Sequence, residues 1–202
     1  MKVQRLPDAL VNQIAAGEVV ERPASVAKEL VENAIDAGAT RIDVEIEGGG
    51  IALLRVVDDG AGMSEADARL ALERHATSKI RSFDDLTRVG TFGFRGEALP
   101  SIASVSRLVL TTRERASEEG LRISVQGGDD LVAEPCGARP GTTVEVRDLF
   151  FNVPARRKFL KSLPTEIGHL QEVLFSAALS RPDLTLTLTK DGRKVSEFLR
   201  VA

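Results

Sequence analysis

The stretch PASVAKELVENAIDAGATRIDVEIEGGGIALLRVVDDGAG, residues 23–62, decides the fold. Over residues 23–37 the apolar positions recur at helical spacing and fill one half of a helical wheel, and Gly38 ends the pattern. Residues 41–47 alternate apolar and polar side chains, whereas residues 51–57 are apolar on both faces. We therefore expect a helix followed by a hairpin, in which an edge strand pairs with a central strand of the sheet.

The remainder of the chain carries both helical and strand patterns. Further helices are expected at 7–16, which Gly17 ends, at 65–75, where Ser64 and Asp67 form a capping box, and at 97–105, 154–162 and 165–179. Further strands are expected at 107–113, 121–127, 131–135, 142–148 and 185–189, with the start of another in KVSEFL (194–199). Residues 76–92 lack a clear period and are expected to form a loop with a short helical turn.

This order of elements lacks the regular strand–helix–strand alternation of a doubly wound fold. We expect an α+β protein, built as a two-layer α/β sandwich with one mostly antiparallel, partly mixed sheet and helices on one face. The chain has 202 residues, 43% of them hydrophobic, which suffices for one domain with a core of its own.

The composition narrows the classes of function. A net charge of −3 argues against a surface that neutralises nucleic-acid phosphates everywhere, although it leaves room for a local basic patch. Trp and Tyr are absent, which removes the usual stacking platform for single-stranded nucleic acid. The single cysteine, Cys136, can form no internal disulfide, so a reducing cytosol is expected. No apolar run is long enough for a membrane helix, and we expect no membrane contact.

The short catalytic motifs with the clearest mechanics are missing: the sequence has no GxxxxGK[ST], HExxH, GxSxG or CxxC. His75 and His169 stand alone, and metal sites need clustered ligands, so packing or surface roles are expected for both.

Three features of the first half could carry chemistry. The first is the pair Glu29 and Asn33, which lie four residues apart on one helix face. A carboxylate and an amide oxygen in this arrangement could orient a water and ligate Mg²⁺. An ordinary solvated polar face explains the same residues, and the helical wheel alone favours that explanation.

The second feature is Asp58-x-Gly60-x-Gly62 at the end of the central strand. A carboxylate there can accept a hydrogen bond from an exocyclic amine, and the glycines let backbone approach a flat ring. An ordinary Asp-Gly turn before a capped helix is an equally good interpretation.

The third feature is the glycine-rich segment GFRGEAL (93–99), which follows HATSK (75–79) and enters a helix. Free N–H groups at a helix start, with Lys79 and Arg95 nearby, favour phosphate binding over a plain surface loop. In chain order the three features suggest water and metal positioning, adenine recognition and phosphate binding. They indicate a nucleotide site without a Walker loop.

Five runs give a resemblance to a known family: residues 12–40, DDGAGM (58–63), RHATSK (74–79), GFRGEAL (93–99) and GTTVEVRDLFFNVPARRKF (141–159). They resemble the N-terminal ATPase region of the MutL family of DNA mismatch repair proteins, which belongs to the GHKL ATPases. The resemblance implies the Bergerat fold, an α/β sandwich. It also implies that residues 1–202 form one GHKL-type ATPase domain and that this is a fragment lacking a following transducer-like lobe and a C-terminal dimerisation domain.

The resemblance assigns roles to individual residues. Glu29 would be the general base that activates the attacking water, Asn33 would ligate Mg²⁺, and Asp58 would bind the adenine amino group. The remaining ATP-binding residues that it implies are Gly60, Gly62, Met63, Thr77, Ser78, Lys79, Gly93, Phe94, Arg95, Gly96, Glu97, Ala98, Leu99 and Thr143. Glu32 and Asp36 would be surface residues without a role.

The mechanism that the resemblance implies is slow Mg²⁺-dependent ATP hydrolysis that acts as a conformational switch. ATP binding would let two ATPase regions form a homodimer in the full-length protein. The closed state would couple a MutS-type mismatch sensor to a downstream nuclease and helicase, in the bacterial cytoplasm. Arg156, Arg157, Lys158 and Lys161 form a basic cluster that could contact DNA weakly, and a solvated helix face is the alternative.

Two other functions stay open. The first is a module that holds ATP without hydrolysing it, because hydrolysis in the family also uses a lysine from a following lobe. We therefore expect weak turnover in this chain. The second is another GHKL ATPase, of the topoisomerase or histidine-kinase type, although GFRGEAL favours the MutL family over both.

Overall fold

The structure is a computed structural model that describes residues 8–74, 76 and 96–201. Its helices are α1 (Asp8–Val19), α2 (Pro23–Asp36), the short 3₁₀ helix η1 (Gly48–Gly50), α3 (Glu65–Leu70), α5 (Ala98–Ser104), α6 (Pro154–Phe159) and α7 (Leu163–Ser180). Its strands are β1 (Arg41–Glu47), β2 (Leu53–Asp58), β3 (Arg107–Arg113), β4 (Gly120–Gln126), β5 (Asp129–Cys136), β6 (Gly141–Arg147), β7 (Thr185–Lys190) and β8 (Arg193–Phe198).

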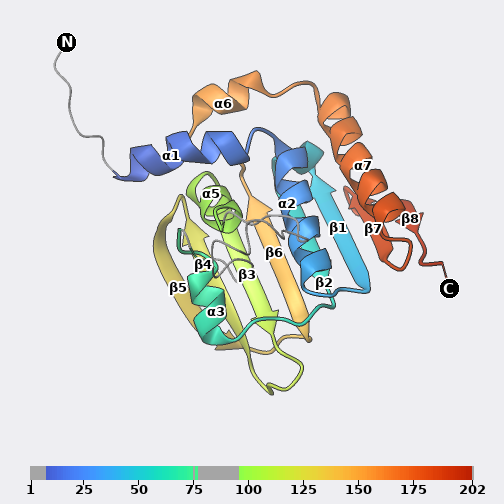
Figure 1. Cartoon of the computed structure of the whole chain (residues 1–202). Helices are drawn as coiled ribbons and strands as arrows, with labels where there is room; N and C mark the ends of the chain where they lie inside the picture. Colours follow the sequence, from blue (N-terminus) through green and yellow to red (C-terminus); the bar gives the residue numbers. More distant parts are fainter. Residues whose placement is uncertain (1–7, 75, 77–95, 202) are drawn as a thin grey trace, which may run out of the picture.

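The strands form one eight-stranded sheet in the order β5-β4-β3-β6-β2-β1-β7-β8. Every neighbouring pair is antiparallel except β1 and β7, which are parallel. The helices α2, α3, α5 and α7 lie on one face of this sheet (Figure 1). The expected α+β sandwich with a mostly antiparallel, partly mixed sheet and helices on one face is therefore confirmed.

The core lies between this sheet face and the helices. In each strand, side chains alternate between the two faces, so Ile42, Val44 and Ile46 of β1 are buried whereas Arg41 and Glu47 are exposed. Helix α2 contributes the largest buried face, which consists of Pro23, Ala24, Val26, Ala27, Leu30, Val31, Ala34 and Ile35. This burial fixes α2 firmly above the centre of the sheet.

Two expectations about the fold are wrong. Strand β1 is not an edge strand, because β7 pairs along its other side, from Arg41 with Thr185 to Ile46 with Lys190. Gly17 does not end α1, which continues to Val19. The Arg156 side chain covers Gly17 so closely that a Cβ there would lie 1.9 Å from Arg156 Nη2, which explains a glycine inside a helix.

Several boundaries also differ from the expected ones. Helices α3 and α6 end earlier than expected, at Leu70 and Phe159. Strand β8 pairs with β7 as a complete hairpin from Arg193 to Phe198. The capping box is present, since Asp67 N donates to Ser64 Oγ over 3.2 Å. No helix among the described residues is both long and apolar enough to cross a membrane.

Candidate functional site

Asp58 closes β2 at the sheet end that also carries the start of β6 and the end of β3 (Figure 1). Leu54 and Val56 are buried under the helices, and Asp58 follows them on the same face of the strand. Its Oδ1 accepts hydrogen bonds from Gly60 N over 2.9 Å and from Thr142 N over 3.2 Å. Its Oδ2 has no hydrogen-bond partner among the described residues.

Burial raises the pKa of Asp58 to about 6, although the two backbone hydrogen bonds from Gly60 and Thr142 act in the opposite direction. The neighbouring charge of Asp59 adds to the increase. At neutral pH the carboxylate is therefore ionised, but in an environment that opposes its charge. A hydrogen-bond donor from a ligand would relieve that cost.

Asp59, the next residue, has a different task. Its carboxylate accepts from Thr40 N over 2.7 Å, from Thr40 Oγ1 over 2.6 Å and from Arg41 N over 2.8 Å. Burial would raise its pKa, but the hydrogen bonds from Thr40 and Arg41 outweigh burial and lower it. Asp59 thus holds the start of β1.

The glycines after Asp58 are required by packing within the chain. Gly62 has a φ of +72°, and a Cβ there would lie 2.1 Å from the carbonyl oxygen of Arg113. A Cβ on Gly60 would lie 2.9 Å from the carbonyl oxygen of Ala37, at the end of α2. The segment from Asp58 to Met63 is therefore pressed between α2 and β3, an explanation that the sequence did not supply.

Of the two threonines in GTT, the structure brings Thr142 and not Thr143 to the Asp58 side. Thr143 pairs with Val57 on one side and Thr111 on the other, and these residues point to the sheet face without helices. Side chains alternate along a strand, so Thr142 shares the helix-covered face with Asp58. The predicted residue Thr143 therefore faces away from the Asp58 side chain, and Thr142 lies on the same side of the sheet as Asp58.

Sequence reasoning missed two further residues at this end. Thr112, fully buried at the end of β3, accepts a hydrogen bond from Met63 N over 2.9 Å. Arg115, in the turn after β3, donates from Nη2 to the carbonyl oxygen of Asp59 over 3.0 Å. In the sequence they are an ordinary strand residue and an ordinary turn residue, and nothing in the local pattern marks them.

Glu29 and Asn33 lie four residues apart on α2, and both are half-buried. The predicted surface residues Glu32 and Asp36 are half-buried as well, and Glu32 lies 3.9 Å from Lys28 in an ion pair. Within residues 8–74, 76 and 96–201, no group of three or more His, Cys, Asp or Glu side chains could hold a metal by itself.

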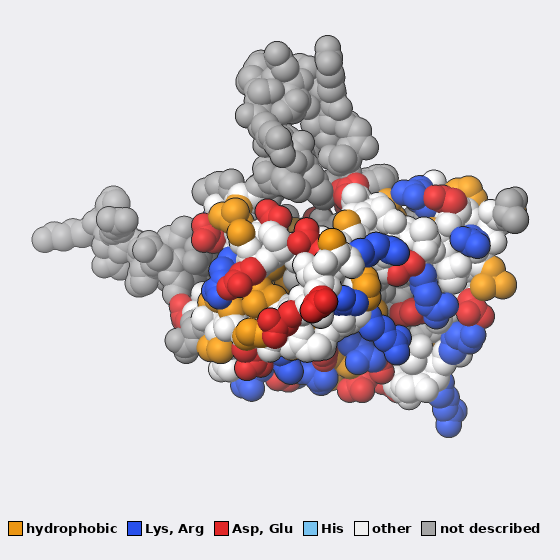
Figure 2. Space-filling view, turned by 90° about the horizontal axis from the view of Figure 1, so that it is seen from below, with side chains coloured by type: hydrophobic (Ala, Val, Ile, Leu, Met, Phe, Trp, Pro, Cys, Tyr) orange, Lys and Arg blue, Asp and Glu red, His pale blue; other side chains and the backbone are white. Residues whose placement is uncertain are grey.

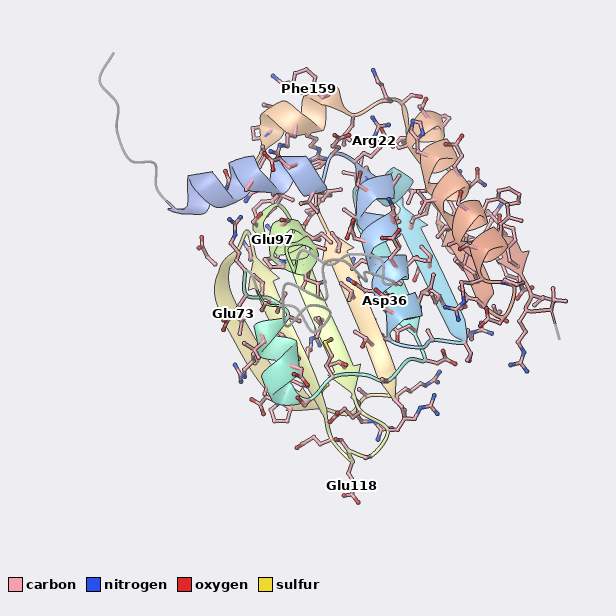
Figure 3. All side chains as sticks on the ribbon, in the orientation of Figure 1. Arg22, Asp36, Glu73, Glu97, Glu118 and Phe159 are labelled. Atoms are coloured by element: carbon pink, nitrogen blue, oxygen red, sulfur yellow. The ribbon has the colours of Figure 1, made fainter. Side chains whose placement is uncertain are left out.

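The predicted phosphate segment is only partly described. Thr77, Ser78, Lys79, Gly93, Phe94 and Arg95 lie outside the described residues. Gly96 has a φ of +63° and precedes Glu97, the N-cap residue of α5, and Ala98 and Leu99 form the first turn of that helix. Figure 3 shows Glu97 at the start of α5, on the same side of the sheet as Asp36 of α2.

The predicted basic cluster lies at the opposite end of the sheet from Asp58, on α6 and just beyond it (Figure 1). Arg157, Lys158 and Lys161 are exposed, and Phe159 among them is 80% exposed. Arg156 differs from them, because its guanidinium packs over Gly17 of α1. Only three of the four predicted cations therefore point to solvent.

The end of the sheet around Asp58 has a mixed charge. In a view onto this end, acidic and basic side chains are interspersed (Figure 2). A hollow of about 360 Å³ there is lined by Val57, Thr111 and Thr143 of the sheet face without helices, and it also reaches Asp58. A hollow of about 460 Å³ lies far from Asp58, between α7 and the β7–β8 hairpin, beside the exposed Phe175.

Comparison with known proteins places these features in a family. Residues 21–130 match the family described as histidine kinase-, DNA gyrase B- and HSP90-like ATPases. Over 193 residues, 96% of the chain, it is 59% identical to the DNA mismatch repair protein MutL of Xanthomonas oryzae pv. oryzae, of which it covers 31%. Over 198 residues, 98% of the chain, it is 59% identical to MutL of Geobacter sulfurreducens, of which it covers 33%. The chain thus spans about a third of these relatives.

Solved structures agree with this placement. The Aquifex aeolicus MutL ATPase domain complexed with ADP matches with a TM-score of 0.73 and 38% identity, over 91% of this chain and 66% of that one. The N-terminal domain of a DNA repair protein matches with a TM-score of 0.81 and 27% identity, over 98% of this chain and 59% of that one.

Proposed function

The chain belongs to the family of histidine kinase-, DNA gyrase B- and HSP90-like ATPases, and within this family it resembles the N-terminal ATPase region of MutL. From this premise we propose a role for each residue of the candidate site. Asp58 binds the adenine of ATP and Glu29 promotes slow hydrolysis. The observation that carries the proposal is the carboxylate of Asp58. Its Oδ1 is held by two backbone N–H groups, and its Oδ2, which has no partner among the described residues, accepts from the ligand.

The adenine end consists of Asp58, Gly60, Gly62 and Met63, with Thr142 in place of Thr143. A buried carboxylate that lacks a charged partner binds an exocyclic amine well, because the amine supplies the donor that burial has removed. The Aquifex aeolicus MutL ATPase domain was solved in complex with ADP, which supports nucleotide binding by this chain. Gly96, Glu97, Ala98 and Leu99 at the start of α5 bind the phosphates. The resemblance assigns the same task to residues 77–79 and 93–95, which lie outside the described residues.

Hydrolysis needs a base near the terminal phosphate, and α2 carries the candidate. Glu29 takes the proton from the attacking water, and Asn33, one turn later, supplies an amide oxygen as a ligand for Mg²⁺. The half-buried position of both side chains fits these tasks. When bound, Mg²⁺ would offset the negative charge of the phosphates.

In the longer protein, ATP binding acts as a switch in DNA mismatch repair in the bacterial cytoplasm. ATP-bound regions form a homodimer, which couples a MutS-type sensor to a downstream nuclease and helicase. The names of the relatives from Xanthomonas and Geobacter support the pathway. The exposed residues Arg157, Lys158 and Lys161 give a weak contact to DNA phosphates.

A calorimetric titration of Mg²⁺-ATP onto the 202-residue chain tests the proposal. Asp58→Ala should weaken binding about 100-fold, because a hydrogen bond to a charged group contributes about 1.5–3 kcal/mol. Glu29→Ala should bind ATP as the wild type does and lose phosphate release by about 100-fold or more. Glu118→Ala, at the exposed tip of the turn after β3 (Figure 3), is the matched acidic control and should change neither.

Two outcomes decide between the proposal and its alternative. Normal ATP binding by Asp58→Ala would contradict the adenine assignment. Binding without any phosphate release by the wild type, in this chain and in a longer form alike, would favour a module that holds ATP without hydrolysing it.

A further inference from the structure

The hydroxyl of Thr112 connects three separate segments at the Asp58 end of the sheet. Thr112 is 1% exposed, and its Oγ1 lies 2.9 Å from Met63 N, 3.2 Å from the carbonyl oxygen of Gly141 and 3.1 Å from Thr142 Oγ1. Met63 belongs to the segment that follows Asp58, and Gly141 and Thr142 begin β6. One buried hydroxyl therefore ties the two segments that surround the Asp58 carboxylate.

Counting protons fixes the direction of these bonds. A hydroxyl has one proton to donate and two lone pairs that accept. All three contacts are hydrogen bonds only if Thr112 donates to Gly141 and accepts from both Met63 N–H and the Thr142 hydroxyl. If Thr112 donated to Thr142 instead, its contact with the Gly141 carbonyl would have no proton. The buried network thus directs the Thr142 proton toward Thr112.

This direction decides what Thr142 offers to a ligand. With its proton turned to Thr112, the half-buried Thr142 hydroxyl presents lone pairs, beside a carboxylate that also only accepts. The Thr142 hydroxyl oxygen and the Asp58 carboxylate would then both accept hydrogen bonds from an exocyclic amine, which has two N–H donors. A carbonyl oxygen at the same place would face lone pairs on both sides and would find no donor, which is costly in a partly buried site.

We infer that Thr112 is a positioning residue for base specificity: by holding the Thr142 hydroxyl as an acceptor, it makes the Asp58 site take 6-aminopurine nucleotides and reject 6-oxopurine nucleotides. This inference rests on the proposed binding of ATP at Asp58. Thr112 itself does not touch the base. It acts through the orientation of Thr142, which becomes free to donate to a carbonyl oxygen once the Thr112 hydroxyl is removed.

The test compares ADP with inosine diphosphate, which carries a carbonyl oxygen in place of the amine, by calorimetric titration on the 202-residue chain. The wild type should prefer ADP. Thr112→Val removes the hydroxyl at nearly constant volume. It should lower the ratio of ADP affinity to inosine diphosphate affinity about tenfold or more, because one hydrogen bond to a charged or buried group contributes about that much. Thr112→Ser retains the hydroxyl and should keep the wild-type preference.

A double-mutant cycle separates action through Thr142 from general loosening of the site. Thr142→Val should narrow the same preference, and adding Thr112→Val to it should change the preference no further. Additive effects of the two changes would overturn the inference. An unaltered preference for ADP over inosine diphosphate in Thr142→Val would also overturn it, and this measurement does not depend on whether Thr112→Val folds. Absence of ADP binding by the folded wild type would instead contradict the proposed function, so the two failures are distinguishable.

Discussion

Helices α2 and α7 lie on the same face of one sheet, yet they are built differently. Helix α2 buries eight of its 14 residues, whereas α7 buries only Glu166, Leu170 and Leu174 of its 18. Phe175 and Leu179 of α7 are 52% and 67% exposed. The difference concerns how firmly each helix is held. Helix α2, which carries Glu29 and Asn33, is fixed by close packing, whereas α7, which lies away from the candidate site, is packed less closely.

The largest expected contrast concerns truncation of one apolar side chain on each helix. Leu30→Ala removes a side chain that is 3% exposed, and the cavity should cost about 2–5 kcal/mol of unfolding free energy. Phe175→Ala on α7 removes a half-exposed ring and should cost roughly 1 kcal/mol or less. Urea denaturation measures both. Equal losses would show that α7 is packed as firmly as α2.

The next contrast concerns the buried charge of Asp58. Its pKa is raised to about 6, so the folded state binds a proton more tightly than the unfolded chain, and stability falls as pH rises from about 4 to about 6. Above pH 6 the full cost remains, up to about 3 kcal/mol for a shift of about two pKa units. Asp58→Asn keeps the acceptor for Gly60 N and Thr142 N but removes the charge.

Asp58→Asn should therefore melt at a higher temperature than the wild type at pH 7.5, and the advantage should disappear near pH 4. Glu118→Gln, an exposed acid at the same end of the sheet, is the control and should show no such dependence. A constant difference between Asp58→Asn and the wild type across this range would show that burial of the carboxylate carries no cost.

A smaller contrast uses one glycine near each helix. Gly62→Ala would place a methyl group 2.1 Å from the Arg113 carbonyl oxygen at a positive φ, and we expect a loss of roughly 2 kcal/mol together with weaker ATP binding. Gly168→Ala on α7 meets nothing within 4 Å and should stabilise the helix by about 0.5–1 kcal/mol. Thermal melts measure whether each variant is less or more stable than the wild type. A change in the same direction for Gly62→Ala and Gly168→Ala would contradict this account.

The smallest expected effect is on DNA contact at α6, next to α7. Replacing Arg157, Lys158 and Lys161 by Ala should lower affinity for duplex DNA and reduce the slope of log affinity against log salt by up to roughly 0.9 per lost contact. Arg156→Ala is the informative comparison, because that guanidinium covers Gly17 and should affect stability more than DNA binding. An unchanged salt slope in the triple variant would remove DNA from the proposed role of this patch.

Much of the fold could be predicted from the sequence because local patterns carry it. The alternation in residues 41–47 and the helical period in residues 23–37 depend only on which side chains avoid water, and both elements were found. The position of β1 within the sheet could not be predicted. An alternating strand has the same pattern at an edge as inside a sheet with one open face, and its partner β7 begins at Thr185, far along the chain.

The candidate site, like the fold, has features that could be predicted from the sequence and features that could not. The local pattern made Asp58 a candidate, because its carboxylate follows a strand and precedes glycines. An ordinary turn explained the same residues equally well, and only the resemblance assigned Asp58 to adenine. The choice between Thr142 and Thr143 could not be made from the sequence, because it depends on a register of one residue between β6 and its neighbours. Thr112 and Arg115 could not be predicted for a related reason. Each forms a hydrogen bond with a segment that is close in space but about 50 residues away along the chain.

The parallel pairing of β1 with β7 has a consequence for how this chain reaches its native state. Arg41 pairs with Thr185, so the sheet joins two strands that lie far apart in the sequence. Contacts between such distant segments form slowly, because the chain between them must first be ordered. During synthesis, β1 emerges long before β7, and until β7 pairs with it, β1 exposes an unpaired strand edge that is prone to aggregation. The last strands of the sheet therefore protect its earliest one.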